Sequence, residues 1–262
     1  MIIDTHCHLD PKEYSNLEEV IKRMKNNIMI TSGTDLESSL NVINLCNKYE
    51  NVYGTIGYHP TELENYSQQN MNIIESNLNN PKVVGIGEIG LDYHYGKENK
   101  DIQIQVFKYQ LDLARKYNMP VVIHSRDALE DTLNIIKQYK DLKITMHCFS
   151  YSKEIAKELI KMNVKIGIGG VLTFKNSIKL KEIVKEIDLK NVLLETDSPY
   201  LTPEPYRGKQ NEPIYVKYVA QEIAKLKQIS EEEVEKITTS NAISQFDLKL
   251  KKWYDFYILR GE

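Results

Sequence analysis

Short apolar runs rich in Ile, Val and Thr recur along the chain and alternate with longer stretches of a different period. Eight runs have the length and composition of strands, at Ile2–Thr5, Ile28–Ser32, Val52–Gly57, Val83–Gly87, Val121–His124, Ile144–His147, Ile166–Gly169 and Val192–Glu195. Between them apolar residues return every three or four positions, as at Leu17, Val20, Ile21 and Met24, which predicts amphipathic helices. The pattern therefore predicts eight strand–helix units.

Strands that alternate with helices pair in parallel, and nearly continuous apolar runs indicate strands buried on both faces. Eight such units favour an α/β fold of the (β/α)8 TIM-barrel type, with residues 1–262 forming one domain. A doubly wound open sheet is the alternative. That fold usually carries a Gly-rich phosphate loop after its first strand, where this chain has Asp4, Thr5, His6, Cys7 and His8.

Helix starts and two irregular segments complete the pattern. Ser15 and Ser230 each precede a Glu by three residues, which is the spacing of a capping box. The four prolines of Ser198–Pro213 predict a long loop, of the kind that carries function. Residues 247–262 are too apolar to lie wholly in water, so we expect an extension that packs on the barrel or on another subunit.

Composition narrows the class of protein. The 34 basic and 37 acidic residues leave a formal charge of -3, which excludes a strongly basic protein that coats nucleic acid. Three cysteines form no disulfide framework, so we expect a reducing, cytoplasmic environment. No apolar run approaches the roughly 20 residues of a membrane span, so we expect no membrane contact. We also expect a monomer.

Residues that bind metals gather where the predicted strands end. Because the carboxyl ends of barrel strands surround one cleft, side chains at these ends converge. The residues at or just after these ends are His6, His8, His59, Glu88, His124, His147 and Asp197. Five of the six histidines are in this set, which a scattered distribution does not explain and a metal centre does.

The spacing of His6 and His8 places both imidazoles on one face of a strand, so that they can bind one ion. Cys7 is then expected to point outward, and Cys148, next to His147, to face the helices. Imidazoles with carboxylates suit Zn, Mn or Fe, and also Mg when more oxygen ligands are present. Thiolate ligands are not expected.

Four histidines and two carboxylates are enough for two divalent metal ions, with Glu88 as the bridge between them. Two ions about 3.5–4 Å apart position a water, lower its pKa and stabilise a displacement at phosphorus. The sequence therefore predicts hydrolysis. Asp197 is expected to be both a ligand and the group that takes a proton from the attacking water.

Other polar residues receive supporting roles. For His59 three roles are open, namely contact with a substrate phosphate, support of the metal ligands, and metal binding itself. Glu195 is expected to lie behind the ligands, and His94 to be an ordinary loop residue. Arg126 and Arg207 are expected to bind the phosphate oxygens of a substrate, because guanidinium groups pair with them in a bidentate way.

Taken in order, several segments of the chain resemble the TatD family of metal-dependent deoxyribonucleases. The matching segments are Asp4–Asp10, Gly57–Pro60, Gly85–Tyr93, Pro120–Arg126, His147–Ser150, Leu194–Tyr200 and Arg207–Pro213. Each alone is weak, but their order is specific. Tyr151 and His94 depart from the residues usual in the family, which bears on substrate access.

The resemblance implies a (β/α)8 barrel and stepwise removal of nucleotides from the 3′ end of DNA, with Mg or another divalent cation. The candidate ions are Mg, Mn and Zn. The resemblance also implies two ligand sets that share one residue, namely His6, His8, Glu88 and Asp197 for one ion and Glu88, His124 and His147 for the other. The alternatives are a D-aminoacyl-tRNA deacylase, which hydrolyses an ester, and another amidohydrolase-like activity at the same metals. Glu88 stands where amidohydrolases commonly use a carbamylated Lys, which favours phosphoesters.

Overall fold

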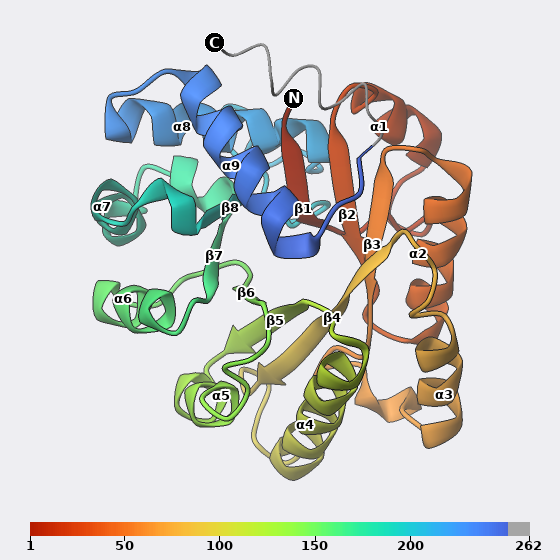
Figure 1. Ribbon diagram of the computed structural model, residues 1–262. Coiled ribbons are helices and arrows are strands. Elements are labelled where there is room, and N and C mark those ends of the chain that lie inside the picture. Colours follow the sequence, from red (N-terminus) through yellow and green to blue (C-terminus); the bar gives the residue numbers. More distant parts are fainter. Residues whose placement is uncertain (251–262) are drawn as a thin grey trace.

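Eight parallel strands form the centre of the computed structural model, in which residues 1–250 are described (Figure 1). Each strand pairs with the next one in chain order, which is the topology of a (β/α)8 barrel. The strands are β1 (Ile3–Cys7), β2 (Ile28–Ser32), β3 (Val52–Ile56), β4 (Val83–Asp92), β5 (Val121–Arg126), β6 (Ile144–Met146), β7 (Lys165–Ile168) and β8 (Val192–Leu194). All eight predicted strands are present, and the largest difference is that β4 continues to Asp92.

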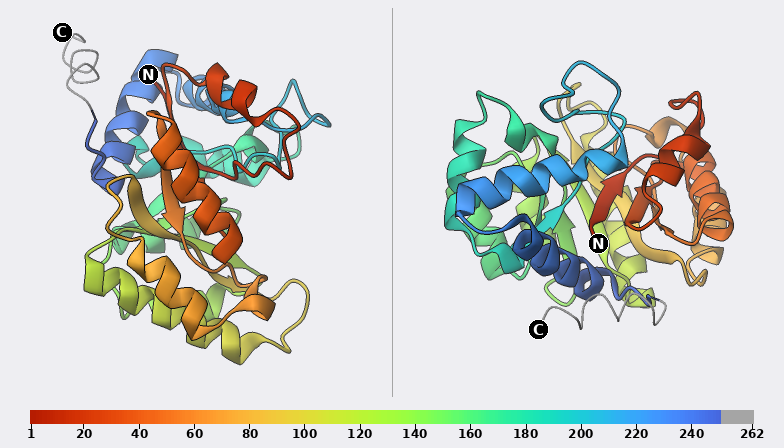
Figure 2. Two further views of the ribbon diagram at one scale, coloured as in Figure 1. Left: turned by 90° about the vertical axis from the view of Figure 1, so that its right-hand side faces the viewer. Right: turned by 90° about the horizontal axis from the view of Figure 1, so that it is seen from above.

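Helices surround the strands, as the views in Figures 1 and 2 show. They are α1 (Leu17–Arg23), α2 (Leu36–Lys48), α3 (Gln68–Ser76), α4 (Lys100–Tyr117), α5 (Leu129–Ile136), α6 (Lys153–Lys161), α7 (Ile178–Glu186), α8 (Val216–Lys227) and α9 (Glu231–Phe246). Short 3-10 helices occupy some of the loops, at Leu63–Asn65, Gly170–Thr173, Leu189–Asn191 and Pro213–Tyr215. Most helices follow a strand directly, so the carboxyl ends of the strands lead into the loops at one end of the barrel.

The barrel is closed where the chain after β8 meets β1. The backbone N–H of Asp197 donates to the carbonyl of His6 at 2.9 Å. Asp4, which is fully buried, accepts hydrogen bonds from the backbone N–H of Thr196 at 2.9 Å and from its hydroxyl at 2.6 Å. His6 and Asp197, two predicted metal ligands, therefore lie where the chain after β8 meets β1 and closes the barrel.

The amino end of the barrel is filled by an apolar cluster. Its members from the strands contact residues of α9 and the turn after it, and they include Ile3, Ile28, Ile30, Val84, Val122, Leu193, Ala242, Phe246 and Leu248. The Thr239 hydroxyl on α9 donates to the carbonyl of Met1 at 3.0 Å, which fixes the helix across this end. Because α9 closes the amino end, the carboxyl end is left for binding.

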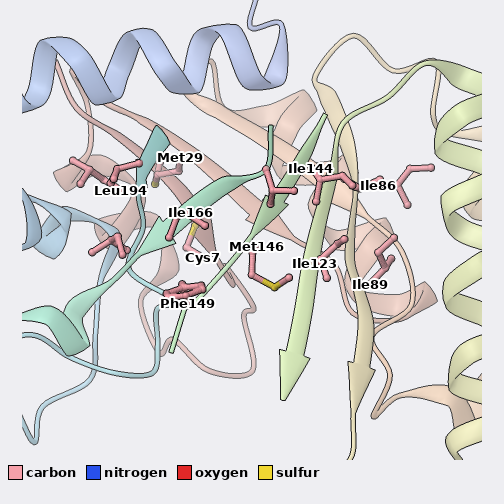
Figure 3. Packing of buried hydrophobic residues seen from close by; sticks show 14 of the residues in the cluster. Cys7, Met29, Ile86, Ile89, Ile123, Ile144, Met146, Phe149, Ile166 and Leu194 are labelled. Carbon is pink, nitrogen blue, oxygen red and sulfur yellow. The ribbon is translucent and has the colours of Figure 1, made fainter. Parts of the chain in front are cut away.

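A larger apolar cluster lies outside the first, between the strands and the surrounding helices. Figure 3 shows side chains from three neighbouring strands in contact there, among them Ile123 of β5, Met146 of β6 and Ile166 of β7. All three are at most 1% exposed. This packing holds the strand ends rigidly in place, which a precise catalytic geometry requires.

One of the two predicted capping boxes is wrong. The chain is still in turns at Ser15, and α1 begins after Asn16, whose side chain makes no capping hydrogen bond. At Ser230 half of the predicted box is present, because its hydroxyl caps α9 by accepting from the backbone N–H of Glu233 at 3.1 Å. A box that the sequence pattern missed starts α2, where Asp35 pairs with Ser38 rather than with the expected Glu or Gln.

The predictions for the two irregular segments, Ser198–Pro213 and residues 247–262, agree with the structure to different extents. Ser198–Pro213 contains no α-helix, as predicted, and ends in a 3-10 helix. At the start of the predicted extension, the Asp247 carboxylate pairs with Lys143 at 2.6 Å and Leu248 is buried on the barrel. The rest of that extension, residues 251–262, lies outside the described residues. None of the helices within residues 1–250 has both the length and the apolar character of a membrane span.

Candidate metal centre

The predicted ligands converge at the carboxyl end of the barrel, and two strand irregularities aim them there. The pairing of β1 with β2 shifts register between Asp4 and Cys7, on either side of His6. The pairing of β4 with β5 shifts between Ile86 and Ile89, on either side of Glu88. Such bulges re-aim side chains, and they are frequent next to active sites.

The two oxygens of the Glu88 carboxylate face two different groups of imidazoles. Oε1 lies 2.7 Å from His147 Nε2 and 3.0 Å from His124 Nδ1. Oε2 lies 3.4 Å from His6 Nε2 and 3.5 Å from His8 Nε2. Each oxygen is thus available to a separate ion, which is the arrangement of a bridging carboxylate.

Asp197 completes the second of these groups. Its Oδ1 atom lies 3.6 Å from His6 Nε2 and 3.5 Å from His8 Nε2, and the two Nε2 atoms are 3.2 Å apart. Two ligand atoms bound about 2.1 Å from one ion at a tetrahedral angle lie about 3.4 Å apart. The donor atoms are therefore spaced as possible ligands of one ion. His6 is also close enough to Glu88 and His147 to form a group of possible ligands with them.

Partners behind the imidazoles fix which nitrogen faces the site. His8 Nδ1 lies 3.1 Å from the carbonyl of Ser32, so this nitrogen donates and Nε2 presents its lone pair to the site. His124 Nε2 lies 2.9 Å from Asp92 Oδ2, which leaves Nδ1 as the ligand atom. A metal-binding histidine usually donates its other N–H in this way.

Asp92 was not among the predicted site residues. It lies four residues after Glu88 on β4, and residues separated by an even number share one face of a strand. This alternation was the signal available in the sequence. The fourth predicted strand ends at Gly87, so the alternation does not reach Asp92 in that prediction.

Glu195 lies behind His147, as predicted. Its carboxylate is fully buried, accepts from the backbone N–H of Cys148, and has one oxygen 3.9 Å from His147 Nδ1. Burial raises the pKa of Glu195 to about 7. A Cβ on Gly167 would lie 2.3 Å from the Glu195 carboxylate, so only glycine leaves room for this side chain.

Charge in the centre suits a divalent cation. Burial raises the pKa of Glu88, but the nearby His147, His59 and His6 outweigh burial and hold that pKa well below its usual range. Burial also opposes ionisation of Asp197, yet its hydrogen bond with His8 and the neighbouring histidines lower its pKa. Both carboxyl groups are therefore ionised at neutral pH, and the residues fit a metal centre in donor type, spacing and charge.

The remaining predicted residues lie at different distances from this centre. His59 Nε2 is 3.5 Å from Glu88 Oε1, so His59 forms a further group of possible ligands with Glu88 and His124. Arg126 lines the cleft into which His59, Glu88 and His124 also face. Arg207 stacks on Phe174 at 4.2 Å and is outside the lining of that cleft.

Three further predictions, for one histidine and two cysteines, can also be compared with the structure. His94 is a loop residue, paired with Asp127 at 2.9 Å. Cys7 is fully buried in the outer apolar cluster, as expected. The prediction that Cys148 faces the helices is wrong, because it lines the cleft. Strand alternation does not apply at Cys148, since β6 ends at Met146 and Cys148 has a left-handed backbone with φ of 45°.

The cleft over the candidate metal ligands has a volume of about 730 Å³. Its lining includes His8, Glu88, His124, His147 and Asp197. Tyr95 and Tyr200 also line it, and they are 79% and 52% exposed. The Arg126 guanidinium lies 5.7 Å from the centre of the Tyr95 ring. The cleft therefore combines buried and half-buried candidate metal ligands with an exposed aromatic and basic rim.

Replacing Asp92 by Ala removes the acceptor that orients His124. We expect metal affinity to fall by about 10–100-fold, the usual effect of losing such a partner. Competition with a fluorescent chelator measures this affinity. Asp141→Ala is the control, because Asp141 pairs with the exposed Arg115 outside the cleft lining. Equal affinities in both variants would contradict a role for Asp92 in the site.

Metal binding is expected to strengthen as pH rises. Burial lowers the pKa of His8 and His124, but contacts with Asp197, Asp92 and Glu88 outweigh burial and raise both values to about 9. Below that pH a metal ion must displace the protons, so affinity increases by about tenfold per pH unit for each proton displaced. Titration of metal-free protein with Mn²⁺ at pH 6, 7 and 8 measures this, and a constant affinity would contradict it.

The fold and the site together define a class, that of the metal-dependent hydrolases built on a (β/α)8 barrel. The family described as TatD related DNase matches residues 3–247. The chain belongs to the TatD family.

Relatives and a solved structure agree with this assignment. YabD of Bacillus subtilis, an "uncharacterized metal-dependent hydrolase", is 45% identical over 248 residues, which cover 92% of this chain and 97% of YabD. YcfH of Escherichia coli, described in the same words, is 34% identical and covers 94% of this chain and 96% of its own. The crystal structure of YJJV, a TatD homolog from Escherichia coli, is similar with a TM-score of 0.89 at 28% identity, covering 94% of this chain and 98% of its own.

Proposed function

We propose that this metal-dependent hydrolase cleaves phosphodiester bonds of DNA and removes nucleotides stepwise from the 3′ end. The observation that carries the proposal is the position of Glu88, with one carboxylate oxygen directed to each of two groups of ligands. Two divalent ions, when bound, supply a water of lowered pKa and positive charge beside the attacking and leaving oxygens. Mg, Mn and Zn all suit the donor set.

The reaction adds water to phosphorus and breaks its bond to the 3′ oxygen of the preceding nucleotide. The 3′ oxygen takes up a proton, and a nucleoside 5′-monophosphate leaves. Asp197 is the group that accepts the proton of the attacking water, since its lowered pKa keeps it ionised at neutral pH and its side chain, which is 15% exposed, lines the cleft. Glu88 is nearly buried, with 4% of its side chain exposed, and fixes the imidazoles around it.

The rim of the cleft supports DNA as the substrate. Tyr95 and Tyr200 are exposed aromatic rings beside the ligands, and aromatic rings stack on the bases of single strands. Arg126 lies in the same lining and can bind phosphate oxygens. The family is described as DNases, which agrees with this substrate.

Replacing Arg126 by Ala is expected to raise the KM for single-stranded DNA by about tenfold, because a charge-assisted hydrogen bond to phosphate is lost. Arg207→Ala is expected to have a smaller effect, since Arg207 lies outside the cleft lining. Steady-state kinetics on a short oligonucleotide measure both. An unchanged KM in both variants would show that neither arginine binds the substrate.

A comparison of substrates tests the proposal. Metal-reconstituted protein is incubated with single-stranded DNA, duplex DNA and aminoacyl-tRNA under the same conditions. We expect stepwise shortening of DNA, and cleavage of the aminoacyl ester that is slower or absent. Rapid deacylation without cleavage of DNA would contradict the proposal and favour the ester hydrolase.

A further inference from the structure

A second cavity, of about 380 Å³, lies beside the cleft, between the loops that follow β6, β7 and β8. We call it the side pocket. Its apolar wall is formed by Phe149, Val171, Ile178, Leu180 and Leu201. The cleft and the side pocket share Cys148, Ser150, Val171, Asp197 and Leu201, so a ligand in the side pocket lies next to a predicted metal ligand. Apart from Asp197, the hydrolysis described above makes no use of the residues that line this cavity.

Apolar side chains of the side pocket are left in contact with water. Ile178 is 64% exposed and Leu201 is 39% exposed, and both belong to its lining. A flat apolar ligand that covers these side chains removes apolar surface from water, which is favourable. The wall therefore suits an aromatic or heterocyclic group better than a charged one.

The side pocket also offers a polar group with free hydrogen-bonding capacity. The Asn176 side chain is in the lining and forms no hydrogen bond with any of the residues 1–250. An amide provides both a donor and an acceptor, as the edge of a nucleobase does. An apolar wall beside an amide is chemistry that recognises a base, and Ser177 and Lys179 of the same lining add a hydroxyl and a positive charge.

The backbone of the lining is unusual as well. Cys148, Asp197 and Leu201 have φ values of 45°, 55° and 54°, in the left-handed region that residues other than glycine rarely adopt. All three contribute to the wall of the side pocket. Such conformations gather at ligand sites, where the surrounding structure holds them in place.

We propose that the side pocket binds the terminal nucleobase of the DNA strand. This inference rests on the proposed exonuclease function. The scissile phosphate of an exonuclease has a continuing strand on one side and one nucleotide on the other. The cleft of about 730 Å³ accommodates the continuing strand, and the smaller side pocket beyond Asp197 accommodates the single terminal base. The terminal base then positions its phosphate over the metal ligands.

The test compares two oligonucleotides that differ only at the 3′ end, where one has a normal nucleotide and the other an abasic residue. The first cleavage is followed with wild-type protein loaded with Mn²⁺. We expect the abasic end to be removed at least about tenfold less efficiently, in kcat/KM, than the normal end. Equal removal of both ends would overturn the side-pocket proposal while leaving the nuclease intact. Cleavage of neither would overturn both.

Two variants locate the effect in the side pocket. Asn176→Ala and Ile178→Asp alter exposed residues that lie outside the lining of the cleft, so the fold and the metal ligands are preserved. We expect each to cleave the normal end more slowly and the abasic end at the wild-type rate. The matched control is Ile73→Asp, since Ile73 is 38% exposed on α3 and lines neither cavity. A preference for the normal end that persists unchanged in both pocket variants would overturn the assignment.

Discussion

Glu88→Gln is expected to lower hydrolysis by about 10³-fold or more. The amide has no charge, and its NH2 group replaces an oxygen that faces imidazole nitrogens at 2.7–3.5 Å. One of the two groups of ligands therefore loses its shared anionic ligand. The rate of hydrolysis is measured on single-stranded DNA, which carries bases, and on bis-p-nitrophenyl phosphate, a phosphodiester that carries none.

The control for this substitution is Glu62→Gln. Glu62 lines the same cleft, but its carboxylate accepts a hydrogen bond from the Thr61 hydroxyl and forms no ion pair with a histidine of residues 1–250. Metal content measured on both variants should fall only for Glu88→Gln. If Glu88→Gln retains more than about a tenth of the wild-type rate at saturating metal, Glu88 does not bridge the ions.

Asp197→Asn is expected to lower kcat by about 10²–10⁴-fold, because an amide cannot take the proton of the attacking water and is a weaker ligand. Asparagine is the suitable replacement, since Asp197 has a φ of 55° and asparagine tolerates this conformation. The backbone hydrogen bond from residue 197 to His6, which closes the barrel, is retained. The variant should therefore fold.

Kinetics at saturating Mn²⁺ separate the two roles of Asp197. If Asp197 were only a ligand, excess metal would restore kcat, whereas loss of the proton acceptor persists at any metal concentration. The pH profile gives an independent readout. With a lowered pKa, wild-type Asp197 is in its active ionised form above the acidic range, so activity should fall only as the pH becomes acidic. An unchanged kcat in Asp197→Asn would contradict the assignment.

The arrangement of strands and helices could be predicted because each strand is a separate apolar run. The carboxyl ends of these strands then indicate where the site lies, because parallel strands bring those ends together. The bulge in β1 could not be read from the sequence. Ile3 and Cys7 are four residues apart and would share a face in a regular strand, yet they lie in different apolar clusters. Pairing with β2, which is not encoded locally, produces that shift.

The supporting contacts of the site were harder to predict than its ligands. Ser32 lies on a different strand from the two histidines that it contacts, and the sequence gives no sign of that proximity. Arg207 appeared equivalent to Arg126 by charge alone, but a loop places it on Phe174. Ligands follow from residue type and strand position, whereas these contacts depend on how loops and neighbouring strands are placed in three dimensions.

The central claim is that two ions, held on either side of Glu88, carry out the removal of nucleotides from a 3′ end. It is tested most directly by titrating metal-stripped protein with Mn²⁺ while following 5′-labelled single-stranded DNA. The account predicts a ladder that shortens from the 3′ end and a rate that reaches its maximum near two equivalents of metal. Cleavage without metal, or intact DNA at two equivalents and above, would contradict it.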